Sequence, residues 1–258
     1  MTTRVLVVGA GGRMGEALLR AIERSFELEL GAALEHAAHP RLGAEVAPGV
    51  KLSADPEMAV GRADVGVDFS TPRSTLALVD AAESRGLPLV IGTTGLKSDD
   101  ETRIARASAH IPIVHAANFS MGIAVLMDLV AEAARRLAGY EIDVLELHHD
   151  QKIDAPSGTA LALARSAAAA RGQELERVAV YAREGITGKR DPSAIGLQAL
   201  RLGDSVGEHT VYFAGPGERV ELSHRAHSRD NFAAGALRAA VWLVGRKPGL
   251  YTMRDVLA

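Results

Sequence analysis

A glycine-rich turn directly after a short apolar strand is the feature that most constrains the fold of this chain. Residues 4–8 are aliphatic and β-branched, as in strands buried on both faces, and residues 9–15 then read Gly-Ala-Gly-Gly-Arg-Met-Gly. Apolar residues recur at helical spacing from Arg13 to Glu23, and strand character resumes from Leu28 to Leu34. This pattern predicts a β-α-β unit.

The alternation of strands and helices continues to about residue 115. Alternating elements with short loops predict an α/β fold, a doubly wound, Rossmann-like parallel sheet with helices on both faces. After a helix at about 123–137, the chain contains mainly strand-like segments and one clear helix, 158–171. A second, α+β domain with a mainly antiparallel or mixed sheet is therefore expected.

The last expected helix, 231–244, carries enough apolar residues to pack back on the first domain. We therefore expect one domain to comprise residues 1–119, completed by the C-terminal segment 229–258. The second domain would comprise residues 120–228.

The charge balance and the lack of cysteine exclude several classes of protein. The 29 Lys and Arg residues nearly balance the 32 Asp and Glu residues without forming a basic stripe, so no nucleic-acid partner is expected. Without cysteine there is no disulfide, thiolate nucleophile or cysteine-ligated metal. No apolar run approaches the roughly 20 residues of a membrane span, and the first residues lead into a strand rather than a secretory region. We expect a soluble, cytoplasmic protein with no membrane partner.

The position of the glycine turn indicates a dinucleotide site. Its spacing, G-x-G-x-x-x-G, departs from the strict fingerprint, but it follows a strand and opens a helix, where backbone N–H groups and the helix dipole favour a pyrophosphate. The alternative is a tight turn without a ligand. The residues expected to contact the cofactor here are Gly9, Ala10, Gly11, Gly12, Arg13 and Met14.

An acidic residue ends the second strand and bears on the choice of cofactor. Glu35 lies about 20 residues beyond Gly15, where a carboxylate accepts hydrogen bonds from the adenosine ribose hydroxyls. It would repel a 2′-phosphate, and His36 is mostly neutral at pH 7, so NADH is the preferred cofactor. Arg13 carries a permanent charge and keeps NADPH as an alternative. The other interpretation of Glu35 is a solvated loop carboxylate.

Two further loops follow strands at the edge where open α/β sheets bind ligands. Both are rich in small and neutral polar residues, which suit a nicotinamide carboxamide. Ordinary turns at strand ends are the alternative. The loop residues expected at the cofactor are Gly92, Thr93, Thr94, Ala116, Ala117, Asn118 and Phe119.

The densest group of reactive side chains lies between residues 146 and 160. Ser157-Gly158-Thr159 precede an apolar helix after Pro156, so N–H groups and hydroxyls converge on a place that suits a carboxylate. Lys152 can pair with another carboxylate or donate a proton, and His148 or His149 can supply acid–base catalysis. An anionic substrate is implied.

This segment has two other interpretations. A metal site could use the histidines with Asp150 or Asp154, but neighbouring strand residues point to opposite faces and Lys152 opposes a cation, so no metal is expected. A helix cap beside a solvated loop explains the serine and threonine but not the histidines and lysine.

Motifs spread over nearly the whole chain resemble the 4-hydroxy-tetrahydrodipicolinate reductase (dihydrodipicolinate reductase) family. Besides the glycine turn they are the stretches 91–95, 116–120, 148–160, 179–185, 203–210 and 232–238, of which 148–160 is highly specific. The resemblance implies NADH- or NADPH-dependent reduction of a cyclic hydroxylated dicarboxylate, with loss of water, in the diaminopimelate route to lysine.

The resemblance also implies roles for individual residues. His148 is the acid–base residue and Lys152 a proton donor; His149, Gly158 and Thr159 contact substrate, and Ser157 lies beside them. The cofactor contacts are those given above, except that His36 replaces a common arginine, which weakens the case for NADPH. Similar proteins are homotetramers through the sheet of the second domain.

Two alternatives are different proteins that share the cofactor domain. One is another nicotinamide-dependent oxidoreductase of amino-acid metabolism, such as a homoserine or aspartate dehydrogenase, against which the histidine–lysine segment argues. The other is a dinucleotide sensor without catalysis, which would bind NADH but not turn over.

Overall fold

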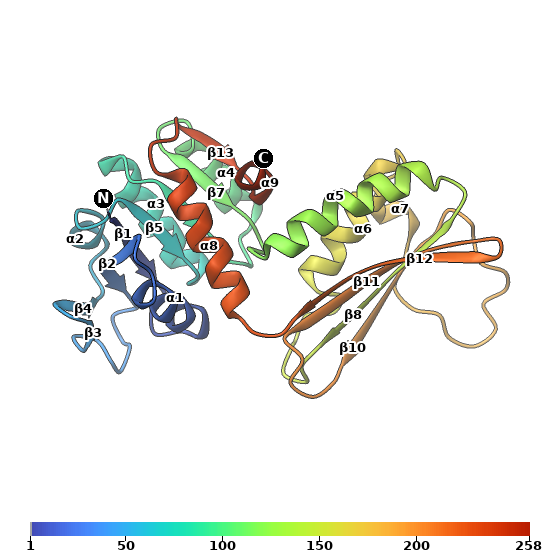
Figure 1. Ribbon diagram of the computed structural model, residues 1–258, viewed down its shortest axis with the longest axis horizontal. Helices are drawn as coiled ribbons and strands as arrows, with labels where there is room; N and C mark the ends of the chain where they lie inside the picture. Colours follow the sequence, from blue (N-terminus) through green and yellow to red (C-terminus); the bar gives the residue numbers. More distant parts are fainter. Residues whose placement is uncertain (1) are drawn as a thin grey trace. The chain divides into compact units, whose positions relative to one another are not determined.

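The structure, a computed structural model, describes residues 2–258, which form two compact units (Figure 1). Unit 1 runs to Met121 and resumes at Arg229, and unit 2 comprises Gly122–Ser228. Within residues 2–258, every helix is too short or too polar to cross a lipid bilayer.

Unit 1 is built on an eight-stranded sheet in the order β13-β7-β6-β5-β1-β2-β4-β3, in which all neighbours run parallel except β3 and β4. The central strand β1 has no accessible surface at Val5, Leu6 and Val7, as its unbroken apolar run predicts. The strands are β1 (Thr3–Val8), β2 (Leu28–Leu34), β3 (Glu45–Ala47), β4 (Val50–Ser53), β5 (Val65–Asp68), β6 (Leu89–Ile91), β7 (Pro112–His115) and β13 (Gly249–Tyr251).

Helices cover both faces of this sheet. On one face α8 packs against α1 and against β5, β6 and β7, while α2, α3 and α4 pack in sequence over the other. Helix α8 can lie close to the backbone at Phe119 because Gly235 has no side chain. A Cβ on Gly235 would lie 1.8 Å from the Phe119 carbonyl oxygen. The helices are α1 (Arg13–Glu23), α2 (Pro56–Val60), α3 (Pro72–Arg85), α4 (Ser98–Ala107), α8 (Asp230–Leu243) and α9 (Met253–Leu257).

Unit 2 contains a five-stranded sheet in the order β12-β11-β8-β10-β9. Helices α5 and α6 bury one of its faces, and no helix of this unit covers the other (Figure 1). The elements are α5 (Met121–Arg136), β8 (Glu141–His148), α6 (Gly158–Ala170), α7 (Leu175–Val178), β9 (Ala179–Val180), β10 (Ile195–Arg201), β11 (Gly207–Gly215) and β12 (Glu218–Ala226).

The structure confirms the predicted fold class, a Rossmann-like sheet followed by an α+β unit. The second sheet is mixed: β12, β11 and β8 are antiparallel neighbours, whereas β8, β10 and β9 are parallel. Several short elements were not predicted, because three to five residues are too few to show a helical or strand periodicity. These are β3, β4, α2, α7, β13 and α9.

Candidate active site

Strand β8 directs a carboxylate and an imidazole to the buried face of the second sheet. Its burial alternates along the strand, so Glu146 and His148 follow Ile142 and Val144 on the face that packs against the helices. Glu146 is 1% exposed and His148 9% exposed. Because a carboxylate is rarely this buried without partners, its surroundings have to supply several hydrogen bonds.

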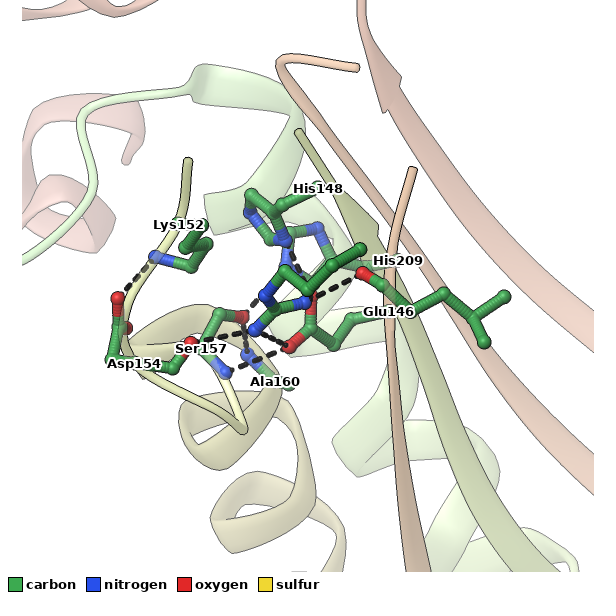
Figure 2. A network of polar contacts seen from close by, with 9 residues as sticks. Glu146, His148, Lys152, Asp154, Ser157, Ala160 and His209 are labelled. Carbon is green, nitrogen blue, oxygen red and sulfur yellow. Dashed lines mark hydrogen bonds and ion pairs between the residues drawn. The ribbon is translucent and has the colours of Figure 1, made fainter. Parts of the chain in front are cut away.

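The Glu146 carboxylate is the centre of a buried polar network, most of which is drawn in Figure 2. Oε1 accepts from the Ser157 N–H at 3.0 Å and from Arg201 Nη2 at 2.9 Å. Oε2 accepts from Arg201 Nη1 at 3.0 Å and pairs with His148 Nδ1. Burial alone would raise the pKa of Glu146, but the hydrogen bonds from His148, Arg201 and Ser157 outweigh it and lower the pKa to about 2. The group is therefore an ionised carboxylate at neutral pH.

A second histidine enters the network from β11. His209 lies opposite Glu146 in the antiparallel register, and its ring meets that of His148 edge to face at 5.2 Å. Its Nε2 is 3.2 Å from Ser157 Oγ, which also accepts from the Ala160 N–H and so caps α6. Burial, with the nearby His148, lowers the pKa of His209 to about 3. His209 is therefore neutral in the folded protein at neutral pH.

This lowered pKa makes stability dependent on pH. Below the ordinary value of 6.5, the unfolded chain binds a proton at His209 that the folded chain does not bind until about pH 3, so the free energy of unfolding falls over that range. Between about pH 7.5 and about pH 5 the loss should be on the order of 2 kcal/mol. Glu146 contributes in the same direction only at lower pH, between 4.5 and about 2.

We expect the variant His209→Gln to lose less stability than the wild type over this interval, as measured by urea unfolding at the two pH values. The exposed His227→Gln serves as the matched control and should follow the wild type. Equal losses in wild type and His209→Gln would contradict the prediction.

The loop between β8 and α6 brings the predicted lysine to the same cluster. Lys152 Nζ donates to Asp154 Oδ1 at 2.8 Å (Figure 2). Arg201 Nη2 donates to the Asp154 carbonyl oxygen at 2.6 Å. His149, next to the strand end, is partly exposed, and its N–H donates to the Ser205 carbonyl oxygen. Gly158 and Thr159 are the first residues of α6, where N–H groups have no acceptor within a helix.

In unit 1, the conformation of the glycine turn requires residues without a Cβ atom at two positions. Gly9 has φ of +76°, and a Cβ there would lie 2.7 Å from the Phe69 carbonyl oxygen. A Cβ on Gly15 would lie 2.2 Å from the Gly9 carbonyl oxygen, so only glycine lets α1 begin against the turn. After Gly12, α1 starts at the exposed Arg13, which leaves the helix N-terminus accessible.

Glu35 lies against this turn. Its Oε2 accepts from the Gly11 N–H and its Oε1 from the His36 N–H, both at 3.0 Å. Together with Gly9, His36 and Ser70 it lines a cavity of about 130 Å³. Each oxygen has one of these contacts, so both keep capacity to accept further hydrogen bonds.

A second cavity, of about 320 Å³, lies where the other two predicted loops meet. Its lining combines parts of both loops with the start of α1 and with aromatic rings: Met14, Phe69, Ser70, Gly92, Thr93, Thr94, Ala117, Asn118, Phe119 and Phe232. Ala116 is not part of the lining; its N–H donates to the Ile91 carbonyl oxygen. The segment Gly9–Met14, Glu35 and the two loops all follow the carboxyl ends of parallel strands, so they lie at one edge of the sheet.

Two residues that line this cavity, Ser70 and Thr93, bind a buried carboxylate, Asp68, at the end of β5. It accepts hydrogen bonds from the hydroxyls of Ser70, Thr75 and Thr93 at 2.5, 2.5 and 3.2 Å. Burial raises the pKa of Asp68, and these hydrogen bonds oppose the rise. Asp68 thereby ties the end of β5 to the loop after β6.

These surroundings suit a dinucleotide. Close backbone approach at Gly9 and Gly15, an accessible helix N-terminus and a carboxylate at the end of β2 are what a pyrophosphate and an adenosine ribose require. Within residues 2–258, no group of three or more His, Asp or Glu side chains is arranged to hold a metal ion.

Four polar residues of these sites were absent from the sequence-based assignment: Asp68, Glu146, Arg201 and His209. Glu146 had a readable pattern, because it falls on the apolar face of β8 between Val144 and His148. Arg201 and His209 come from strands more than 50 residues away, and only strand pairing brings them to Glu146.

Comparison with known proteins identifies the family of this chain. The family model described as dihydrodipicolinate reductase, N-terminus, matches residues 3–119, and that described as dihydrodipicolinate reductase, C-terminus, matches residues 122–257. Relatives named 4-hydroxy-tetrahydrodipicolinate reductase from Thiobacillus denitrificans and Halorhodospira halophila are 48% and 43% identical. Each comparison covers 100% of this chain and 99% of the relative.

Solved structures share the fold. The dipicolinate-bound dihydrodipicolinate reductase from Paenisporosarcina sp. TG-14 superposes with a TM-score of 0.80 at 23% identity, covering 99% of both chains. A probable dehydrogenase from Thermotoga maritima has a TM-score of 0.64 at 13% identity, covering 98% of this chain and 92% of the other.

Proposed function

This chain belongs to the dihydrodipicolinate reductase family, and from that premise we propose how its residues divide the reaction between the two units. The reaction is the NAD(P)H-dependent reduction of 4-hydroxy-tetrahydrodipicolinate to tetrahydrodipicolinate, with loss of water, in the diaminopimelate route to lysine. One observation supports assigning cofactor binding and proton transfer to different units. The buried Glu146–His148 pair lies beside the cap of α6 in unit 2, whereas the glycine turn lies in unit 1.

Unit 1 binds the dinucleotide, which supplies a hydride when bound. The glycine turn receives the pyrophosphate, and Glu35 accepts from the ribose hydroxyls with its remaining lone pairs. The cavity lined by Thr93, Thr94 and Asn118 has the size and the polar groups for the nicotinamide end. The remaining contacts are Gly9, Ala10, Gly11, Gly12, Arg13, Met14, His36, Gly92, Ala116, Ala117 and Phe119.

Unit 2 binds the cyclic dicarboxylate. The start of α6 offers the N–H groups of Gly158 and Thr159 to one carboxylate, with Ser157 holding the helix cap. Lys152 and His149 supply cationic or hydrogen-bonding partners for the substrate. A dicarboxylate is also what the Paenisporosarcina neighbour binds.

His148 and Lys152 handle the protons. Per turnover the substrate gains one hydride and one proton and loses one water. The water takes the departing hydroxyl together with a proton from the neighbouring ring carbon, so the proton gained is the one delivered to the ring with the hydride. His148 is the acid–base group because imidazole changes protonation near neutrality, and Lys152 is a proton donor. Asp154, at 2.8 Å, orients the Lys152 ammonium until substrate arrives.

The reaction is tested by a coupled assay. The upstream synthase makes the unstable substrate in place, and oxidation of the reduced nicotinamide is followed by its absorbance. Cofactor oxidation that requires both the synthase and this protein is the expected result. No oxidation, with intact NADH binding, would instead support a dinucleotide sensor.

We further propose that NADH is preferred to NADPH, because Glu35 places a negative charge where the 2′-phosphate would lie. The variant Glu35→Gln keeps an oxygen for the Gly11 N–H but removes the charge. Its ratio of kcat/KM for NADH over NADPH should fall about tenfold, equivalent to about 1.4 kcal/mol, a modest Coulomb energy near a protein surface.

The matched control is Glu29→Gln, an exposed carboxylate on the same strand, which should leave the ratio unchanged. A wild-type enzyme with much lower KM for NADPH at equal kcat would overturn the preference.

Finally, we propose a homotetramer assembled through the open face of the second sheet. That face has no helix cover and bears a groove of about 860 Å³ lined in part by Asp143, Gln198 and Tyr212. Exposed apolar side chains nearby on the chain, Tyr181, Leu200 and Leu202, are 54%, 41% and 57% accessible. Light scattering that gives the mass of a monomer would exclude the proposal.

A further inference from the structure

We propose that Glu146 is the positioning residue for His148: it holds the proton of the neutral ring on Nδ1, so that Nε2 is the atom that exchanges protons with the substrate. The inference rests on the proposed role of His148 and deepens it. Glu146 does not touch the substrate in this scheme; it acts only through the imidazole.

The first step is that Glu146 cannot turn away from His148. Arg201 donates to both oxygens of the Glu146 carboxylate, at 2.9 and 3.0 Å, and the Ser157 N–H donates to Oε1 at 3.0 Å. A two-pronged contact of this kind fixes the plane of a carboxylate as well as its position. The oxygen that remains directed at the imidazole is Oε2, which pairs with His148 Nδ1 (Figure 2).

The second step concerns the tautomer. An ionised carboxylate only accepts hydrogen bonds, so the nitrogen that faces Glu146 has to carry a proton. In the neutral ring that proton is on Nδ1 and the lone pair is on Nε2. When Nε2 takes up a proton, the adjacent carboxylate stabilises the resulting imidazolium.

The third step is that the chain leaves space at Nε2. Gly207, at the start of β11, lies beside it, and a Cβ on Gly207 would come within 2.9 Å of Nε2. The His148 side chain is still 11% exposed, although Glu146 is fully covered. The ring is thus held at Nδ1 from the buried side, and the missing side chain at position 207 keeps a Cβ away from Nε2.

The same arginine also supports the loop that carries the other proton donor. Arg201 Nη2 donates to the Asp154 carbonyl oxygen at 2.6 Å, and the Asp154 carboxylate pairs with Lys152. Arg201 therefore links the orientation of His148 to the position of the Lys152 loop.

The experiment compares Glu146→Gln with the wild type in two readouts. Glutamine keeps Oε1 as acceptor for Arg201 Nη2 and the Ser157 N–H. In place of Oε2 it turns an amide donor toward Nδ1 and Arg201 Nη1, which favours the proton of His148 on Nε2 and removes one of the two Arg201 contacts. We expect kcat to fall about 10-fold to 100-fold and the KM for the dicarboxylate to change less than about threefold. The analogous Asp-to-Asn change beside the histidine of a serine protease lowers kcat about 10⁴-fold for the same reason.

The second readout is the ¹⁵N chemical shifts of His148 in histidine-labelled protein, assigned by their absence in His148→Ala. The wild type should show protonated Nδ1 in the neutral ring, and Glu146→Gln should show protonated Nε2. A role of Glu146 in folding alone would not change the tautomer. The control Glu208→Gln removes a partly exposed carboxylate paired with Arg225 on the neighbouring strand, and should match the wild type in both readouts.

A second variant, Glu146→Asp, keeps the test informative if Glu146→Gln does not fold. Glu146→Asp keeps the negative charge for Arg201 but withdraws the oxygens from His148 by about one C–C bond, roughly 1.5 Å. It should lower kcat while preserving the melting temperature more closely. Wild-type kcat and unchanged tautomer in a folded Glu146 variant, alongside an inactive His148→Ala, would overturn this inference alone. An active His148→Ala would overturn the proposed acid–base role of His148, on which the inference rests.

Discussion

Replacing His148 or Lys152 by alanine should lower kcat at least about 100-fold, the usual worth of a positioned acid–base group. His148→Ala removes the imidazole but leaves the pairing of Glu146 with Arg201, so the folded unit should survive. Lys152→Ala should also raise the KM for the dicarboxylate, because the lysine is proposed to meet a carboxylate. Steady-state kinetics in the coupled assay measure both effects.

The controls match each change by residue type. His227 and Lys97 are exposed and distant in sequence from the reactive segment, so His227→Ala and Lys97→Ala should retain wild-type kinetics. NADH binding should be retained in His148→Ala, Lys152→Ala and His227→Ala, since these residues lie in unit 2 and the dinucleotide is proposed to bind unit 1. Unchanged kcat in both His148→Ala and Lys152→Ala would contradict the proposed mechanism.

The variant Gly15→Ala should weaken NADH binding about 100-fold. The added Cβ would lie 2.2 Å from the Gly9 carbonyl oxygen and 2.5 Å from Ala10 Cα. Both are backbone atoms, so the turn has to move, and a displacement of about 1 Å in a binding group can cost that much. Overpacking should also lower the free energy of unfolding by about 1 to 3 kcal/mol.

Titration of NADH by fluorescence, together with thermal melting, checks this expectation. Gly61→Ala is the control within the same unit, because a Cβ there would have its nearest neighbour at 3.6 Å and its φ is −73°. Wild-type NADH affinity in a folded Gly15→Ala protein would contradict the structural role of this glycine.

Much of the fold was predictable because it is encoded locally. The apolar run at the start of the chain, the glycine turn and the helix that follows predicted β1, α1 and β2 within one or two residues, since strand and helix periodicities are properties of neighbouring residues. The mixed pairing of the second sheet was less predictable. β8 has β11 on one side and β10 on the other, and the residues of a single strand do not specify its neighbours.

The site residues likewise include some that local sequence predicts and some that only the folded structure places. His148, Lys152 and the Ser157 cap lie within ten residues of one another, so their concentration was visible in the sequence. Glu146 lay in the same segment, on the alternating face of β8 that is buried, but its pairing with Arg201 depends on the folded sheet. His209 looked like an ordinary strand residue until the register with β8 placed it opposite Glu146.

By itself the sequence determined the fold class, the glycine turn, the acidic end of β2 and the family resemblance, because each depends on the order of nearby residues. Only the tertiary structure decided which groups surround His148. Arg201 and His209 are brought there by strand pairing, and the charge and protonation of Glu146 and His209 depend on burial and on those partners. The physical reason is that desolvation and hydrogen bonding act between atoms close in space, whatever their separation along the chain.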